Sequence, residues 1–222
     1  MRINRFVAIA SGMSRRAADK AILEGRISVD GHIATPATVL ADDSEVMLDG
    51  QLIMAPLATE TIALNKPKGY VVSRDGQGSR TVYDLLPEEL HELKPVGRLD
   101  KYSSGLLLLT NDGELAHRLT HPSFQKIKIY EARLNKALQP LHRQMINDMG
   151  IQLEDGLSKL QLERLHDGDD FAWRVIMHEG RNRQIRRTFE AFGYTVVDLH
   201  RISFGSYQLG TIPSGKYKQI SD

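Results

Sequence analysis

The four consecutive leucines at residues 106–109 constrain the fold of this chain more than any other stretch. Polar residues and glycines bound the run on both sides, at residues 103–105 and 110–113. A short apolar run between turn residues is typical of a strand that is buried on both faces. Asp100 precedes this strand in a polar Arg-Leu-Asp-Lys cluster. Because a buried strand is a rigid support, we expect the core to hold the charge of Asp100 in a fixed position.

Composition adds bounds on location and chemistry. The chain has 222 residues, of which 41% are hydrophobic and 26% charged, as is ordinary for a protein with a packed core. It has no cysteine, which excludes disulfides, thiolate zinc sites and cysteine nucleophiles. No apolar run approaches the roughly 20 residues of a membrane helix, and the N-terminus lacks the apolar segment of a secretory signal. We therefore expect a cytoplasmic protein that does not span a membrane.

The net charge is only +1, so an argument for a nucleic-acid partner depends on where the charges lie. Residues 2–26 contain six Lys or Arg and two acidic residues, whereas residues 27–60 contain no Lys or Arg. A basic segment followed by an acidic one predicts a strongly polarised small domain. Residues 51–60, which include Pro56 and several alanines, are the best candidate for a linker.

Apolar residues at helical spacing predict an amphipathic helix near the N-terminus. Ser14 fits the N-cap of a second helix over residues 15–24, and Gly25 fits its C′ position. Residues 26–34 have the pattern of a short hairpin. The arginines at the start of the second helix lie beside the positive end of its dipole, where an anionic partner would explain them. A solvated helix face is the alternative.

The rest of the chain mixes expected strands and helices. Alternation and apolar runs predict strands at residues 61–64, 70–72, 106–109, 126–134, 160–165, 171–177 and 194–199. Helices are expected over residues 114–119, 139–149 and 181–192. The two lysines that flank Pro67 are either solvated or directed at an anion.

A second basic cluster lies at residues 181–187, with Glu179 as the acidic residue at its edge. On a helix, Arg183 would lie on the same side as Arg186 and Arg187. Three guanidinium groups could therefore form a phosphate-binding face, and one of them could turn inward to a buried carboxylate.

Metal and nucleotide sites are poorly supported. The acidic cluster at residues 166–170 lacks the spacing of a calcium loop and fits a hairpin turn better. The histidines form no zinc motif, and neither a phosphate-binding loop nor a dinucleotide fingerprint is present. We therefore expect neither a metal nor a cofactor.

The N-terminal segment RINRFVAIASGMSRRAADKAILEGRISVDGHIA resembles the alpha-L motif, a small RNA-binding module named after a ribosomal small-subunit protein. In that family the two helices and the hairpin lie on structured RNA, with the Ser-Arg-Arg start of the second helix near phosphates. The resemblance implies that RNA is contacted by Arg5, Ser14, Arg15, Arg16 and Lys20.

Three further pieces, GRLDKYSSGLLLLTNDG, KIKIY and EGRNRQIRR, resemble the motifs of RNA pseudouridine synthases in the same order. With the alpha-L module in front and NKPKG opening the second part, the arrangement resembles the RsuA-type branch, which acts on ribosomal RNA. It implies an α+β fold: an RNA-binding module over residues 1–50, a linker over residues 51–60, and a catalytic domain over residues 61–222 with a mixed, mainly antiparallel sheet.

The implied reaction turns a specific uridine of ribosomal RNA into pseudouridine. The N-glycosidic bond breaks, the base rotates, and a carbon rejoins the sugar without redox change, so no cofactor is needed. The resemblance assigns Asp100 as the catalytic carboxylate and Arg186 as the partner that keeps it ionised. Tyr130 would stack on the base and assist a late proton transfer, and Ile185 would pack on the other face. Whether Asp100 attacks the sugar, attacks the base or removes a sugar proton is open.

The target nucleotide must leave its helix to react, and the surrounding phosphates need basic partners. The candidates are Arg98, Lys128, Arg183 and Arg187. The expected partner is ribosomal RNA or a pre-ribosomal particle, bound by a monomer. Two alternatives are a non-catalytic RNA-binding factor, which has no use for an acidic residue in a basic cleft, and a hydrolase, which needs a metal carboxylate cluster.

Overall fold

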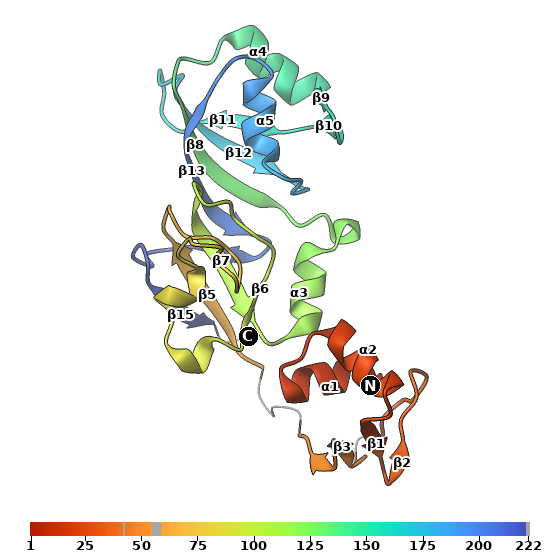
Figure 1. Cartoon of the computed structure of the whole chain (residues 1–222). Coiled ribbons are helices and arrows are strands. Elements are labelled where there is room, and N and C mark those ends of the chain that lie inside the picture. The colour runs from red at the N-terminus through yellow and green to blue at the C-terminus, as the bar shows by residue number, and fades with distance from the viewer. Residues whose placement is uncertain (42, 55–58, 221–222) are drawn as a thin grey trace. The chain divides into compact units, whose positions relative to one another are not determined.

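The computed structural model describes residues 1–41, 43–54 and 59–220. The chain forms two compact units, Met1–Thr59 and Glu60–Asp222, whose elements are labelled in Figure 1. Among the helices of the described ranges, none combines the length and the apolar character that crossing a membrane requires.

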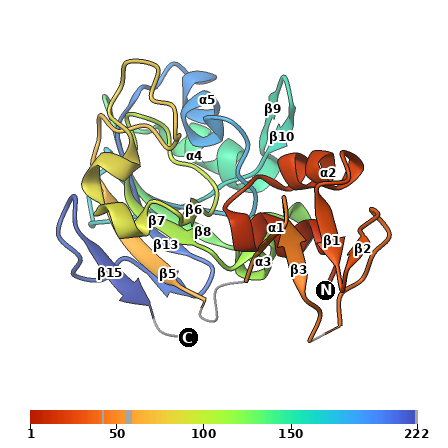
Figure 2. The same ribbon diagram turned by 60° about the horizontal axis from the view of Figure 1, so that its bottom comes forward.

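Two helices and a small sheet make up the first unit (Figure 2). Helix α1 (Ile3–Ser11) ends at Gly12, whose φ of 74° suits glycine. Helix α2 (Arg15–Leu23) starts after Ser14, whose hydroxyl accepts a hydrogen bond from the backbone N–H of Ala17 at 3.1 Å. The predicted N-cap is therefore confirmed.

The sheet of this unit is antiparallel, in the order β2-β1-β3-β4. Its strands are β1 (Ile27–Val29), β2 (His32–Ile33), β3 (Val46–Leu48) and β4 (Gln51–Leu52). The buried side chains that join both helices to the sheet include Ile3, Val7, Ala18, Ile22, Ile27 and Val46.

Strand β4 lies where we expected the linker to begin, so this part of the linker prediction is wrong. Asp49 and Gly50 have φ values of 52° and 76°, which close a tight turn and return the chain onto β3. The predicted linker also includes residues 55–58, which lie outside the described residues.

The second unit is built on a nine-stranded sheet with the order β11-β12-β8-β13-β7-β5-β15, with β14 paired to β13 and β6 to β7. Its strands are β5 (Thr61–Lys66), β6 (Lys94–Pro95), β7 (Ser104–Thr110), β8 (Lys128–Leu134), β11 (Gln161–Arg164), β12 (Ala172–Met177), β13 (Val196–Phe204), β14 (Tyr207–Gln208) and β15 (Tyr217–Ile220). Among these strands, β7 and β13 pair in parallel and the other neighbours are antiparallel. The expected α+β class with a mixed, mainly antiparallel sheet is confirmed.

Short helices and one hairpin complete this unit. They are η1 (Val82–Leu85), η2 (Glu88–Leu90), α3 (Gly113–Thr120), η3 (Pro122–Phe124), α4 (Pro140–Gln144), the π-helical turn η4 (Met145–Met149), the hairpin of β9 (Ile151–Leu153) and β10 (Gly156–Ser158), and α5 (Gln184–Glu190). Residues 70–72, expected as a strand, make only an isolated bridge between Val71 and Thr81.

The leucine run is the centre of this sheet. The side chains of residues 106–109 are all 0% exposed. Leu107 and Leu109 belong to the core under η1, η2 and α5, whereas Leu106 and Leu108 belong to the core under α3. The prediction of a strand buried on both faces is therefore confirmed.

A glycine permits the one parallel contact of the described sheet. Gly105 of β7 is the register partner of Arg201 in β13. It has a φ of 101°, and a Cβ built on it would lie 2.2 Å from the carbonyl oxygen of Arg201. A side chain would have no room at this position, because the backbones of β7 and β13 meet there.

We predict that Gly105→Ala lowers the free energy of unfolding by about 3 kcal/mol, since it adds overpacking to an unfavourable φ. The matched control is Gly113→Ala, because Gly113 is the first residue of α3 and has nothing within 4 Å of its built Cβ. The control should be neutral or slightly stabilising. Urea unfolding followed by circular dichroism measures both, and equal stability of the two variants would contradict the prediction.

Candidate active site

Asp100 lies in the loop before β7, at the edge of the core that the leucine strand supports. Its side chain is 26% exposed. One carboxylate oxygen, Oδ1, accepts the backbone N–H of Tyr102 at 2.9 Å, and Oδ2 lies 3.4 Å from Nε of Arg186. The carboxylate is therefore held from two sides while part of it faces solvent.

The arginine motif places Arg186 against this loop. Arg186 is 7% exposed, and besides Asp100 it donates to the carbonyl of Val196 at 2.6 Å, to the carbonyl of Tyr102 at 3.2 Å and to Oγ of Ser103 at 3.3 Å. These bonds fasten α5 to the loop of Asp100 and to the start of β13, which fixes the ion pair.

The environment keeps Asp100 ionised. Burial is the largest influence and opposes ionisation, but the Ser103 hydroxyl, the charge of Arg186 and the Tyr102 N–H together outweigh it. The pKa of Asp100 is therefore lowered below its usual value. A carboxylate that stays charged in a partly dry site can act as a base or a nucleophile.

Lys66 belongs to the same neighbourhood and corrects our expectation for the lysines beside Pro67. It is 0% exposed, and its Nζ donates to the carbonyls of Ser103 at 2.7 Å and Pro67 at 3.0 Å. Lys66 is thus neither solvated nor free to bind an anion, whereas Lys68 pairs with Asp198 at 2.9 Å. The NKPKG motif was the signal for Lys66, but its burial depends on tertiary packing.

Two other charged groups, Asp100 and Arg201, influence the pKa of Lys66. Burial lowers its pKa to about 8, with the charge of Asp100 opposing and that of Arg201 adding to the shift. Arg201, which the sequence did not single out, lies in β13 and is 2% exposed. Its Nε donates to the carbonyl of Leu106 at 2.8 Å and its Nη1 to Oη of Tyr130 at 3.5 Å.

Tyr130 and Ile185, the two residues expected to contact the uracil base of the target nucleotide, belong to the core. Tyr130 of β8 is 8% exposed and pairs across the sheet with Arg201. Ile185, the residue before Arg186, is 4% exposed and lies in the same core cluster as Tyr130. The fold thus gathers Asp100, Arg186, Tyr130 and Ile185 on the α5 side of the sheet.

Each arginine of the expected phosphate-binding face of α5 has an acidic partner within the protein, and its contact with a phosphate stays a prediction. The helix begins only at Gln184, and Arg183 is its N-cap with a φ of 47°. Arg183 pairs with Glu190 at 3.7 Å, Arg186 turns inward, and Arg187 makes two bonds of 3.1 and 2.6 Å to Asp155. Asp155 lies between β9 and β10, a hairpin that the sequence did not predict.

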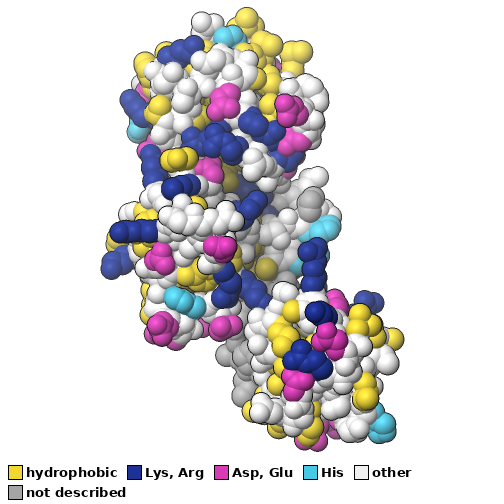
Figure 3. Space-filling model, viewed as in Figure 1, with side chains coloured by type: hydrophobic (Ala, Val, Ile, Leu, Met, Phe, Trp, Pro, Cys, Tyr) yellow, Lys and Arg dark blue, Asp and Glu magenta, His cyan; other side chains and the backbone are white. Residues whose placement is uncertain are grey.

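Two other phosphate candidates differ in environment. Arg98 is exposed and has no hydrogen-bond or ion-pair partner within the described ranges. Lys128 is half-buried, and its ammonium lies 5.0 Å from the ring centre of Phe204. Burial and the charge of Arg201 lower the pKa of Lys128, against a smaller opposing effect of Glu179. Figure 3 shows Lys and Arg side chains concentrated across the middle of the visible face of the second unit.

In the first unit, the RNA-contact candidates cluster on α1 and α2. Arg15 and Arg16 are exposed at the start of α2, and Lys20 is exposed and pairs with Glu24 at 3.6 Å. Arg5 is half-buried on α1, and Ser14 serves as the N-cap.

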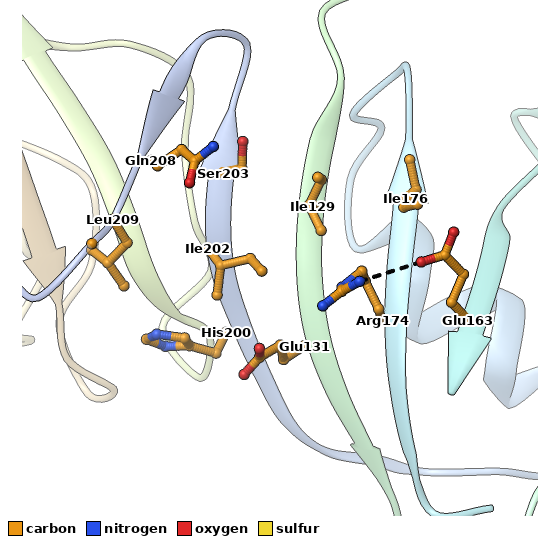
Figure 4. Close-up of a pocket in the computed structure, with 11 residues that line it drawn as sticks. Ile129, Glu131, Glu163, Arg174, Ile176, His200, Ile202, Ser203, Gln208 and Leu209 are labelled. Carbon is orange, nitrogen blue, oxygen red and sulfur yellow. Dashed lines mark hydrogen bonds and ion pairs between the residues drawn. The ribbon is translucent and has the colours of Figure 1, made fainter. Parts of the chain in front are cut away.

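A cavity of about 400 Å³ lies on the opposite face of the sheet from Tyr130 (Figure 4). Ile129 and Glu131, the neighbours of Tyr130 in β8, line it together with His200. Side chains alternate between the two faces of a strand, so this cavity is separate from the Asp100 site. No group of three His, Asp or Glu side chains that could hold a metal occurs among the described residues.

Comparison with known proteins identifies both units. The model of the RNA pseudouridylate synthase family matches residues 60–191, and that of the S4 domain matches residues 1–46. A solved structure titled as a pseudouridylate synthase superposes with a TM-score of 0.71 at 29% sequence identity, covering 100% of this chain and 96% of that one.

Relatives match along nearly the whole chain. An uncharacterized RNA pseudouridine synthase of Aquifex aeolicus is 37% identical, covering 100% of this chain and 90% of that protein. Proteins named ribosomal large subunit pseudouridine synthase B are 33% identical in Bacillus subtilis and 36% identical in Vibrio cholerae. These two alignments each cover 99% of this chain, and 92% and 71% of the relative, respectively.

The chain therefore belongs to the RNA pseudouridine synthase family. It is an enzyme that isomerises uridine in RNA to pseudouridine, and it carries an S4 domain, an RNA-binding module, at its N-terminus. The family resemblance of the three sequence motifs is confirmed.

The Asp100–Arg186 pair predicts a pH effect. In the wild type the lowered pKa keeps Asp100 charged well into the acid range, so activity should fall only when the pH passes below that pKa. Arg186→Gln removes a charge that favours ionisation and leaves burial, which opposes it. The acid limb of the pH profile of kcat/KM should therefore move to higher pH. An unchanged limb would show that this limb does not report Asp100.

Proposed function

We propose that this enzyme modifies a specific uridine of ribosomal RNA, and that Asp100 is its catalytic carboxylate. The observation that carries the role of Asp100 is a half-buried carboxylate that lies 3.4 Å from Nε of Arg186 and whose pKa Ser103 and Arg186 lower against the effect of burial. The names of two relatives favour large-subunit RNA as the substrate. Work on ribosomal RNA agrees with the cytoplasmic location expected from the sequence.

The proposed mechanism starts with the target nucleotide flipped out of its helix, at a cost of roughly a few kcal/mol. The ionised Asp100 acts at the junction of sugar and base, where the N-glycosidic bond breaks. Arg186 bonds to the carboxylate and is itself held in place by three further bonds to neighbouring groups. Tyr130 stacks on the uracil ring while the base turns. The new carbon–carbon bond then forms, the ring carbon that makes it loses its proton, and the nitrogen freed from the sugar takes up a proton, so the oxidation state does not change.

Release of uracil from the sugar leaves electrons on the base. The buried cations Lys66 and Arg201 surround this region with positive charge, and fixed positive charge stabilises a developing negative charge in a dry site. This supports an isomerase better than a binding factor, because affinity alone would not require a half-buried carboxylate near these cations.

We predict that Asp100→Asn, which keeps the shape of the side chain but cannot ionise, abolishes pseudouridine formation. Cells that lack the protein are complemented with the wild type or with the variant, and pseudouridines in ribosomal RNA are mapped. The matched control is Asp112→Asn, because Asp112 caps α3 and asparagine is an equally good N-cap. The control should restore every site.

The same experiment separates the alternatives. If no uridine loses its modification in the deleted strain, ribosomal RNA is not the substrate. If Asp100→Asn restores the site, Asp100 is not the catalytic residue and the ionised carboxylate has another role.

For the S4 domain we propose that Arg15 and Arg16 contact phosphates. Replacing both with alanine should weaken RNA binding and reduce the slope of log K against log salt concentration by about 1.5, since each phosphate contact contributes about 0.7 to 0.9. Filter binding at several salt concentrations measures this slope. Arg26→Gln is the control, because Asp49 already neutralises Arg26 through a bidentate pair. An equal effect of both changes would contradict the proposed contacts.

A further inference from the structure

Arg201 is an arginine that the core buries without a carboxylate. It is 2% exposed, and no aspartate or glutamate of the described ranges forms an ion pair with it. Its Nη2 is buried and has no hydrogen-bond partner among the described residues. A buried charge without a counter-ion is unfavourable, so stability does not explain an arginine at this position.

Its neighbours make the position still less favourable. Lys66 and Lys128 are buried or half-buried, and the charge of Arg201 contributes to the lowered pKa of each. Arg201 therefore repels both lysines, while Asp100 is the carboxylate that acts on Lys66 and Glu179 the one that acts on Lys128. Arrangements that weaken the fold in this way are typical of functional sites.

Arg201 is held by Leu106 and Phe204 and contacts Tyr130. Nε is anchored on the carbonyl of Leu106, at 2.8 Å, and the guanidinium carbon lies 4.9 Å from the ring centre of Phe204. With the guanidinium fixed in this way, Nη1 lies 3.5 Å from Oη of Tyr130. The pairing of β13 with β8 sets Arg201 directly across from Tyr130.

This contact fixes the orientation of the Tyr130 hydroxyl. An arginine can only donate hydrogen bonds, so the oxygen of Tyr130 must be the acceptor. The hydroxyl proton must then point away from Arg201. Hydrogen bonds of catalytic groups are often long before the substrate binds and shorten in the complex, and the unused Nη2 is a second donor close at hand.

We propose that Arg201 is a positioning residue that fixes the ring of Tyr130 and turns its hydroxyl proton toward the bound base. The inference rests on the proposed role of Tyr130 at the target base. Arg201 itself does not touch the substrate in this proposal, and it acts through the tyrosine oxygen.

The test compares Arg201→Met, which keeps the length of the side chain without the charge, with Arg201→Lys, which keeps a donor. Single-turnover rates are measured on ribosomal RNA isolated from cells that lack the protein. We expect Arg201→Met to lower the rate about 10- to 100-fold while RNA affinity changes less than about twofold, and Arg201→Lys to recover part of the loss. The Tm of Arg201→Met should equal or exceed that of the wild type.

A double-mutant cycle isolates the action through Tyr130. In a Tyr130→Phe background the hydroxyl is absent, so Arg201→Met should cause little further loss. An equal loss in both backgrounds, or a Tm that falls together with the rate, would overturn the inference and make Arg201 a structural residue. If Tyr130→Phe has no measurable turnover, two other results decide. They are whether Arg201→Lys reacts faster than Arg201→Met, and whether the Tm of Arg201→Met equals or exceeds that of the wild type.

The control is Arg174→Met. Arg174 lies in β12 and lines the cavity on the other face of the sheet, where it pairs with Glu163 at 3.4 Å (Figure 4). The Arg174→Met variant should keep the wild-type rate.

The wild type and Asp100→Asn are assayed in parallel. A wild type without activity refutes the proposed substrate, whereas an active wild type with an equally active Arg201→Met refutes only the role of Arg201.

Discussion

The close approach of β7 and β13 at Gly105 is the constraint on which the catalytic unit depends. Two antiparallel halves, β11-β12-β8-β13 and β7-β5-β15, are joined by this one parallel pairing. Asp100 comes just before β7, Arg201 lies on β13, and Tyr130 lies on β8, the other neighbour of β13. A side chain at residue 105 would push the two backbones apart. The geometry of the site therefore depends on the absence of a single Cβ.

The second constraint is electrostatic. Asp100 interacts with Arg186 and Lys66, and Arg201 in turn acts on Lys66; all three cations are less than a tenth exposed. Burial alone would raise the pKa of the carboxyl group, and hydrogen bonds together with the charge of Arg186 lower it instead. Because fixed charges in a dry site need no rearrangement when charge develops on a substrate, such a cluster can both hold a catalytic anion and receive negative charge from a base.

The arginine motif shows where reasoning from sequence stops. Spacing along a helix correctly allowed one arginine to turn inward, as Arg186 does. The same spacing did not reveal that the helix starts one residue after Arg183 or that Asp155 binds Arg187. Helical periodicity is a local property, whereas an ion pair between residues 32 positions apart depends on how a distant hairpin folds back.

By itself, the sequence determined the leucine strand, the capped α2, the α+β class and the family, because these depend on local periodicity, turn residues and motif order. It also pointed to Asp100 as a charge on a rigid support. Only the tertiary structure decided that Lys66 is buried, that Arg201 faces Tyr130, and that Gly105 must remain without a side chain. Each of these depends on the pairing of strands that are far apart in the chain. Local sequence patterns do not predict which distant strands pair.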